Sequence, residues 1–223
     1  LPLMLKETSG RAMLAAVEEV QATDRWNSFD RFHDTTETLL RRYEEAGVGA
    51  EVEAIQTGGR IGTGRWIIQE AADVREATVD VVTPVCERVL DWRENPWHVI
   101  QWSAGTPREG LRLRLLILDD RREIERLPAD GLTGSIVLTR MNPRGGLKLL
   151  ADKGAAGVIF DGEVHNLPGA LAWTKFGWGA IPLERSSARL VGFVLSARQG
   201  DKLRRLSRRH GGLMVQVKAD IRK

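Results

Sequence analysis

The chain has 223 residues, of which 42% are hydrophobic and 28% charged, and its formal net charge is +3 at pH 7. These values are typical of a folded soluble protein that buries a sizeable core, so neither a metal nor a disulfide is needed for stability. The single cysteine, Cys86, excludes an internal disulfide, and no apolar run approaches the roughly 20 residues that cross a membrane.

The length predicts one large domain or two small ones, at about 100–200 residues per domain. A single cysteine fits a reducing, cytoplasmic compartment. A chain that starts at Leu1 is also compatible with secretion after an upstream signal has been removed. The sequence therefore leaves the location open, and it does not say whether Lys223 is a native terminus.

Two amphipathic helices are predicted first, over residues 9–22 and 30–46, because apolar residues recur there at helical spacing. Gly47 is suited to end the second helix, since glycine adopts the left-handed conformation without strain. Small apolar residues then alternate with glutamates, which predicts a half-buried strand over residues 50–55.

Further strands are predicted over residues 65–68 and 77–82, the second ended by Pro84. Residues 94–110 carry two prolines and two glycines, a composition typical of a connection between domains. We therefore expect an N-terminal extension of helices and strands over residues 1–110 and a second domain over residues 111–223.

The second half alternates short strands with short helices. Strands are predicted over residues 111–118, 134–140, 157–160, 193–195 and 213–219. A short helix over residues 147–153 should end at Gly154, and Ser196 with Gln199 forms a capping box that should start the last helix. Strand–helix–strand units imply at least one parallel pair. The predicted fold class is α/β, as a mixed α+β arrangement with short crossover helices.

Three segments of the second half carry a family resemblance. They read GSIVLTR at 134–140, KLLADKGAAGVIF at 148–160 and VGFVLSARQGDKL at 191–203. In these segments residues 111–223 resemble the protease-associated (PA) domain, and the N-terminal half has a weaker similarity to the segment that precedes this domain in di-zinc aminopeptidases. The resemblance implies a non-catalytic module, with zinc held only by a peptidase domain that would follow.

The zinc ligands of such a peptidase are not found in this sequence. None of the histidines precedes an aspartate by two residues; they are His33, His98, His165 and His210. The Glu-Glu pairs at 18–19 and 44–45 lie on amphipathic helices, where exposed carboxylates are common. We expect no catalytic, cofactor-binding or metal-binding residue in this chain, which argues against an enzyme.

Two other interpretations stay open. Asp161, Glu163 and His165 alternate after a predicted strand and could form the site of a stand-alone hydrolase. Four arginines at 204, 205, 208 and 209 fall on one face of the last helix and could bind nucleic acid, although solvated helix faces commonly look like this.

A tryptophan-rich segment is the candidate contact surface for a peptide or protein partner. Its residues are Trp173, Lys175, Phe176 and Trp178. Tryptophan suits a contact because its ring is apolar and its N–H can donate, but packing of a long loop would use the same residues. The predicted function is a non-catalytic PA module that shapes substrate access or protein contacts for an aminopeptidase-like metallopeptidase. We expect a catalytic domain, a peptide or another protein as partner, with a homodimer as an option and neither membrane nor nucleic acid.

Overall fold

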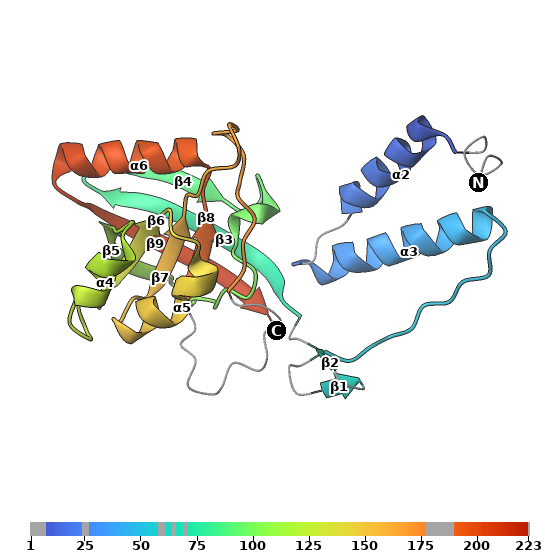
Figure 1. Cartoon of the computed structure of the whole chain (residues 1–223), viewed down its shortest axis with the longest axis horizontal. Coiled ribbons are helices and arrows are strands. Elements are labelled where there is room, and N and C mark those ends of the chain that lie inside the picture. The colour runs from blue at the N-terminus through green and yellow to red at the C-terminus, as the bar shows by residue number, and fades with distance from the viewer. Residues whose placement is uncertain are drawn as a thin grey trace. The chain divides into compact units, whose positions relative to one another are not determined.

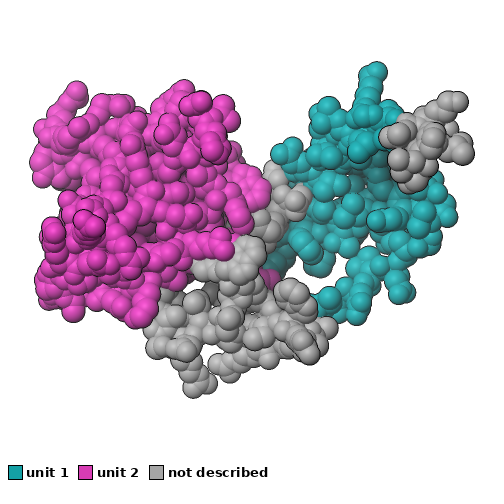
Figure 2. Space-filling model, in the orientation of Figure 1, with its two compact units in different colours: residues 1–56 teal, residues 57–223 magenta. Residues whose placement is uncertain are grey.

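The computed structural model describes residues 8–23, 27–57, 61–63, 66–68, 71–176 and 190–222 (Figure 1). It forms two compact units, Leu1–Gln56 and Thr57–Lys223 (Figure 2). The predicted boundary near residue 110 thus falls inside the second unit. None of the helices in the described part of the chain is long and apolar enough to span a membrane.

The first unit is a pair of helices, α2 (Gly10–Thr23) and α3 (Phe29–Glu45), close to the two predicted ranges. The Ser28 side chain accepts the Arg31 N–H and so caps the start of α3. Gly47, just beyond α3, has the expected left-handed backbone with φ of 72°. The two helix predictions are therefore confirmed.

Polar contacts join the two helices. Glu19 of α2 forms ion pairs with Arg41 and Arg42 of α3, and the Thr35 hydroxyl donates to the Thr23 hydroxyl over 2.9 Å. Within residues 10–23 and 29–45, Thr35 is the only buried side chain. Val20 and Leu40 are half-buried, and six large apolar side chains of this pair are exposed; they are Met13, Leu14, Val17, Phe32, Leu39 and Tyr43.

The predicted strand over residues 50–55 is wrong for this structure. Residues 48–57 are extended and exposed, and they pair with no strand among the described residues. The alternation of residue types describes what a strand would bury, but a strand exists only where a neighbour completes its hydrogen bonds.

The second unit is built on a seven-stranded mixed sheet, beside a short hairpin of β1 (Ile61–Thr63) and β2 (Trp66–Ile68). Its strands run in the order β4-β3-β9-β5-β6-β7-β8. They are β3 (Asp73–Thr83), β4 (Glu87–Asp91), β5 (Leu111–Ile117), β6 (Ser135–Thr139), β7 (Gly157–Phe160), β8 (Val191–Val194) and β9 (Leu213–Arg222). Strands β5 to β8 are parallel and the remaining pairs antiparallel.

Helices cover the sheet on both faces (Figure 1). Leu203 of α6 (Ala197–His210) joins one buried cluster, whereas α4 (Arg121–Arg126) and α5 (Pro143–Asp152) contribute Ile124 and Leu150 to the other. Along β6, Ile136 points into the first cluster and Val137 into the second. A strand buried on both faces needs the continuous apolar run that β6 has. The mixed α+β fold with a parallel pair is confirmed.

Local signals set several helix ends. The capping box of Ser196 and Gln199 starts α6, and Gly211 ends it with φ of 72°. Helix α5 begins four residues before the predicted start, because Pro143 fits the first turn and the Asn142 side chain accepts the Arg144 N–H. Helix α4 was not predicted, since six residues are too few to show a helical period.

The proline- and glycine-rich stretch after β4 covers the outer edge of β8. The Ile100 N–H donates to the Gly192 carbonyl and the Ala104 N–H to the Leu190 carbonyl, each over 3.0 Å. The Gly192 N–H in turn donates to Ser103 Oγ over 2.8 Å. This stretch therefore protects a sheet edge and does not separate two domains.

We expect a fragment of residues 71–223 to unfold cooperatively on heating and one of residues 111–223 not to. Strand β9 pairs with β3 on one side and β5 on the other, so the shorter fragment leaves β9 with an open edge. It also removes Val74, Val79 and Val81 from the core. Thermal unfolding followed by circular dichroism compares the two, and a cooperative transition of residues 111–223 alone would contradict the expectation.

The stability of the β8 edge should depend on pH through His98. This buried side chain follows Pro96 and Trp97 in a single 3-10 turn, and its Nδ1–H donates to the Val194 carbonyl over 2.7 Å. Burial lowers the pKa of His98, and this effect exceeds the opposite influences of the Val194 carbonyl and Glu94.

As the pH falls below about 6.5, the unfolded chain takes up a proton that the folded chain resists, so the free energy of unfolding should decrease. Full stability is retained above that pH. The urea midpoint should change less between pH 7.5 and pH 5.5 for His98→Gln than for the unchanged protein. A loss of stability that is the same at both pH values cancels in this comparison. An equal difference in both proteins would assign the pH dependence to other groups.

Candidate functional site

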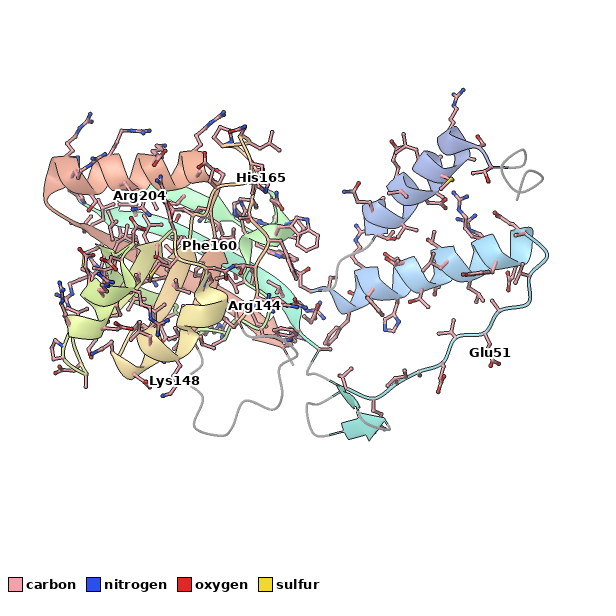
Figure 3. The ribbon with its side chains drawn as sticks, in the orientation of Figure 1. Glu51, Arg144, Lys148, Phe160, His165 and Arg204 are labelled. Atoms are coloured by element: carbon pink, nitrogen blue, oxygen red, sulfur yellow. The ribbon has the colours of Figure 1, made fainter. Side chains whose placement is uncertain are left out.

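A charged cluster lies where the parallel strands end. Asp119 follows β5, Arg140 follows β6 and Asp161 follows β7, so their positions meet at the carboxyl edge of the sheet. Arg204 reaches the same edge from α6, where Figure 3 labels it. This edge is a common place for ligand sites in sheets of parallel strands.

The geometry of this edge is that of a closed ion-pair network. Asp161 is fully buried and accepts hydrogen bonds from Arg204 Nε over 2.9 Å and Nη2 over 2.8 Å. Arg204 also donates to Asp119 over 2.5 and 3.0 Å. Burial opposes the charge of Arg204, but the two carboxylates outweigh it and raise the pKa of the guanidinium above its ordinary value. At Asp119, burial acts to raise the pKa of the carboxyl, but the hydrogen bonds and positive charges of Arg204 and Arg140 outweigh burial and lower this pKa.

Gly200 of α6 makes the approach possible. A Cβ atom at this position would lie 2.0 Å from Asp161 Oδ2, so only glycine lets the helix come so close to the carboxylate. Because Asp161 is held by two nitrogens of the Arg204 guanidinium, we assign this network to fixing α6 on the sheet.

The three alternating residues 161, 163 and 165 do not come together. Asp161 is buried in the network, while Glu163 and His165 are exposed. Across the described residues, no group of three or more His, Cys, Asp or Glu side chains could hold a metal ion. The basic face of α6 is likewise divided, since Arg204 is committed to two carboxylates and Arg205, Arg208 and Arg209 are exposed.

Arg204→Met should destabilise the protein by about 3–5 kcal/mol, because it removes both hydrogen-bonded contacts of the buried Asp161 carboxylate and leaves Arg140, 3.9 Å away, as its counter-charge. Lys148→Met is the matched control. It breaks an exposed pair with Asp152 and should cost at most about 0.5 kcal/mol. Urea unfolding measures both, and similar losses in the two variants would show that the Asp161 pair is not a principal support of α6.

A second cluster lies on the surface and contains two of the predicted contact residues. Trp173 and Lys175 belong to the extended segment before residue 177, which pairs with residue Gln101 beside β8. The Gln101 N–H donates to the Thr174 carbonyl over 3.2 Å and the Phe176 N–H donates to the Gln101 carbonyl over 3.1 Å. These two bonds fix the segment next to the turn that carries Trp102.

Side chains alternate along this segment. Thr174 and Phe176 are buried, whereas Trp173 is 51% exposed and Lys175 is half-buried. The Phe176 ring packs on Gly192, where a Cβ atom would lie 2.5 Å from the ring. Phe176 therefore anchors the segment from below and does not form part of its outer surface.

Lys175 lies between two indole rings. Its Nζ is 5.3 Å from the centroid of the Trp173 ring and 5.6 Å from that of the Trp102 ring, distances at which a cation is attracted to an aromatic face. Burial lowers the pKa of Lys175, and the nearby positive charge of Arg144 lowers it further. Lys175 thus lies against two tryptophans, and the positive charge of Arg144 acts on it from the first turn of α5.

Trp102 was not predicted as part of the site. It has φ of 66° and lies in a turn closed by the Ser103 N–H and the Ile100 carbonyl. Glycine or asparagine usually occupies such a position, and a bulky residue there costs about 1–3 kcal/mol. The residues around Trp102 do not predict this left-handed conformation. The fourth predicted contact residue, Trp178, lies outside the described residues.

No family model and no curated protein matches the chain. Solved structures are similar to it. The M28 peptidase precursor from Shewanella amazonensis SB2B is 15% identical with a TM-score of 0.53, over 68% of this chain and 36% of that one. The putative peptidase from Clostridium acetobutylicum is 13% identical with a TM-score of 0.52, over 96% and 35%. The aminopeptidase from Aneurinibacillus sp. strain AM-1 is 16% identical with a TM-score of 0.49, over 97% and 46%.

The chain has a peptidase-related fold. The likeness is one of architecture, and the chain spans less than half the length of each of these three proteins. The match to the Clostridium acetobutylicum protein covers nearly the whole chain, whereas the match to the Shewanella amazonensis protein covers about two thirds of it. The predicted relation to peptidases is confirmed at this level.

Proposed function

We propose that this peptidase-related chain is a non-catalytic module, of the protease-associated type in its second half, that serves an aminopeptidase-like metallopeptidase. Zinc and the catalytic residues would belong to a separate catalytic domain, and the module would shape access of peptides to it. The observation that carries the proposal is the exposed apolar surface of residues 13–55.

This surface exposes many large apolar side chains to solvent. Nine large apolar side chains of α2, α3 and residues 48–55 are between 43% and 62% exposed. Burying one such side chain fully is worth about 1.5–3 kcal/mol. Large exposed apolar surfaces are typical of protein contacts. Ion pairs and a hydroxyl contact join α2 to α3, and these nine side chains stay exposed and available to a partner.

The extended residues 48–57 support the same partner. Val48, Val52 and Ile55 are each at least 50% exposed, and the backbone of the segment pairs with no strand in the described part of the chain. A partner domain with a free strand edge could form backbone hydrogen bonds with this segment, and an apolar face of the same domain could bury the exposed side chains of the helices. The catalytic domain of an aminopeptidase-like enzyme, with the fold likeness above, is the partner that we propose.

Activity is the first test. The purified chain with added zinc should not hydrolyse leucine p-nitroanilide, because its sequence offers no His-x-Asp pair for a two-metal site. Hydrolysis that zinc restores and a chelator removes would contradict the non-catalytic role.

Docking is the second test. The protease Glu-C should cut the isolated chain first after Glu51 or Glu53, since this segment is exposed and extended, and the cuts should be suppressed when the cognate catalytic domain is present. Phe32→Glu should abolish this protection because it places a charge on the apolar surface. The neighbouring His33→Glu introduces the same charge beside it and should retain protection. Cleavage at equal rates with and without the catalytic domain would rule out the proposed docking surface.

A further inference from the structure

We propose that Trp102, Trp173, Lys175 and Arg144 form a binding site for a peptide carboxylate that is flanked by an apolar side chain. The inference rests on the proposed function in that the peptide would be one presented to the peptidase. It also extends the function, because the site lies entirely within the second unit and needs no residue of a catalytic domain.

Hydrogen bonds and a buried ring hold the two segments of the site in place. Backbone hydrogen bonds on both sides of Gln101 hold the segment of Lys175, and the buried Phe176 ring fixes it to the sheet. On the other side, Ser103 is buried and accepts the Gly192 N–H, which holds the turn of Trp102. Side chains that are positioned before a ligand arrives lose little entropy when it binds.

The backbone of Trp102 is in a strained conformation. The left-handed conformation of Trp102 brings its indole to Lys175. Such a conformation in a bulky residue persists only where surrounding contacts impose it, and strain of this kind concentrates at ligand sites.

Charge decides the class of ligand. The ammonium of Lys175 lies against two rings, and Arg144, labelled in Figure 3 at the start of α5, adds a second positive charge that acts on it. The hydroxyl of Thr174 donates to Asn142 over 3.2 Å and ties the segment to the first turn of that helix. Two adjacent cations favour an anion. The half-exposed ring of Trp173 next to them offers an apolar surface for a neighbouring side chain.

A peptide supplies such a carboxylate either at its C-terminus or from an aspartate. The experiment uses three peptides: N-acetyl-Ala-Leu-Phe as the free acid, the same peptide as its amide, and N-acetyl-Ala-Asp-Phe-Ala amide. Calorimetry gives the dissociation constants for the full chain, and the indole N–H resonances of Trp102 and Trp173 report the place of binding. At least one carboxylate peptide should bind at least about tenfold more tightly than the neutral amide, and the preferred peptide identifies the source of the carboxylate.

Variants locate the interaction. Lys175→Gln should weaken carboxylate binding about tenfold or more while Lys175→Arg largely retains it. Trp173→Ala should weaken the carboxylate peptides and the neutral amide together. Lys148→Gln, which removes an exposed lysine of the same helix as Arg144, is the control and should bind as the unchanged chain does. Circular dichroism verifies that each variant is folded.

Three results would overturn the site: equal affinity for the neutral amide, unchanged carboxylate binding in folded Lys175→Gln, or indole resonances that do not move at millimolar peptide. The outcome is separate from that of the docking test. Peptide binding without docking to a catalytic domain leaves the site intact, whereas docking without peptide binding removes the site and leaves the proposed module.

Discussion

The sheet of the second unit depends on the pairing of its last strand. Strand β9 lies between β3 and β5 and is antiparallel to both. It therefore connects the antiparallel strands that precede the proline- and glycine-rich stretch to the parallel strands that follow it. Val215 and Val217 are fully buried in the cluster that spans both parts. With β9 at this place, the chain on either side of residue 110 shares one core.

The two edges of the parallel part are treated differently. At the carboxyl edge, the buried Asp161 carboxylate and Arg204 lock α6 in place, and Gly200 provides the space. The outer side of β8 is instead covered by residues 99–104 through backbone hydrogen bonds. This covering turn carries Trp102 to the surface beside Lys175. The candidate peptide site is therefore a product of the way in which the sheet ends.

The helix pair of the first unit differs from the sheet because it leaves large apolar side chains exposed. Helix α3 is capped by Ser28, and ion pairs and a hydroxyl contact join it to α2, while six large apolar side chains of the pair are exposed. A short isolated helix pair gains little stability without apolar burial. The exposed apolar faces are thus most simply explained as one side of an interface, which is why a catalytic domain is the proposed partner. The fold likeness to peptidases, of which the matches cover 36% and 35%, agrees with that proposal.

Local signals in the sequence determined much of the secondary structure. The strand Gly157–Phe160, the capping box at Ser196 and the left-handed Gly154, with φ of 83°, all depend on neighbours within a few residues. The tertiary structure decided what depends on distant partners: the pairing of β3 with β9, the lack of a strand partner for residues 48–57 in the described part of the chain, and the burial of Phe176 next to Lys175. Periodicity reveals which side chains a segment could bury. It does not reveal which strand or ring will meet them, because that depends on contacts between residues far apart in the chain.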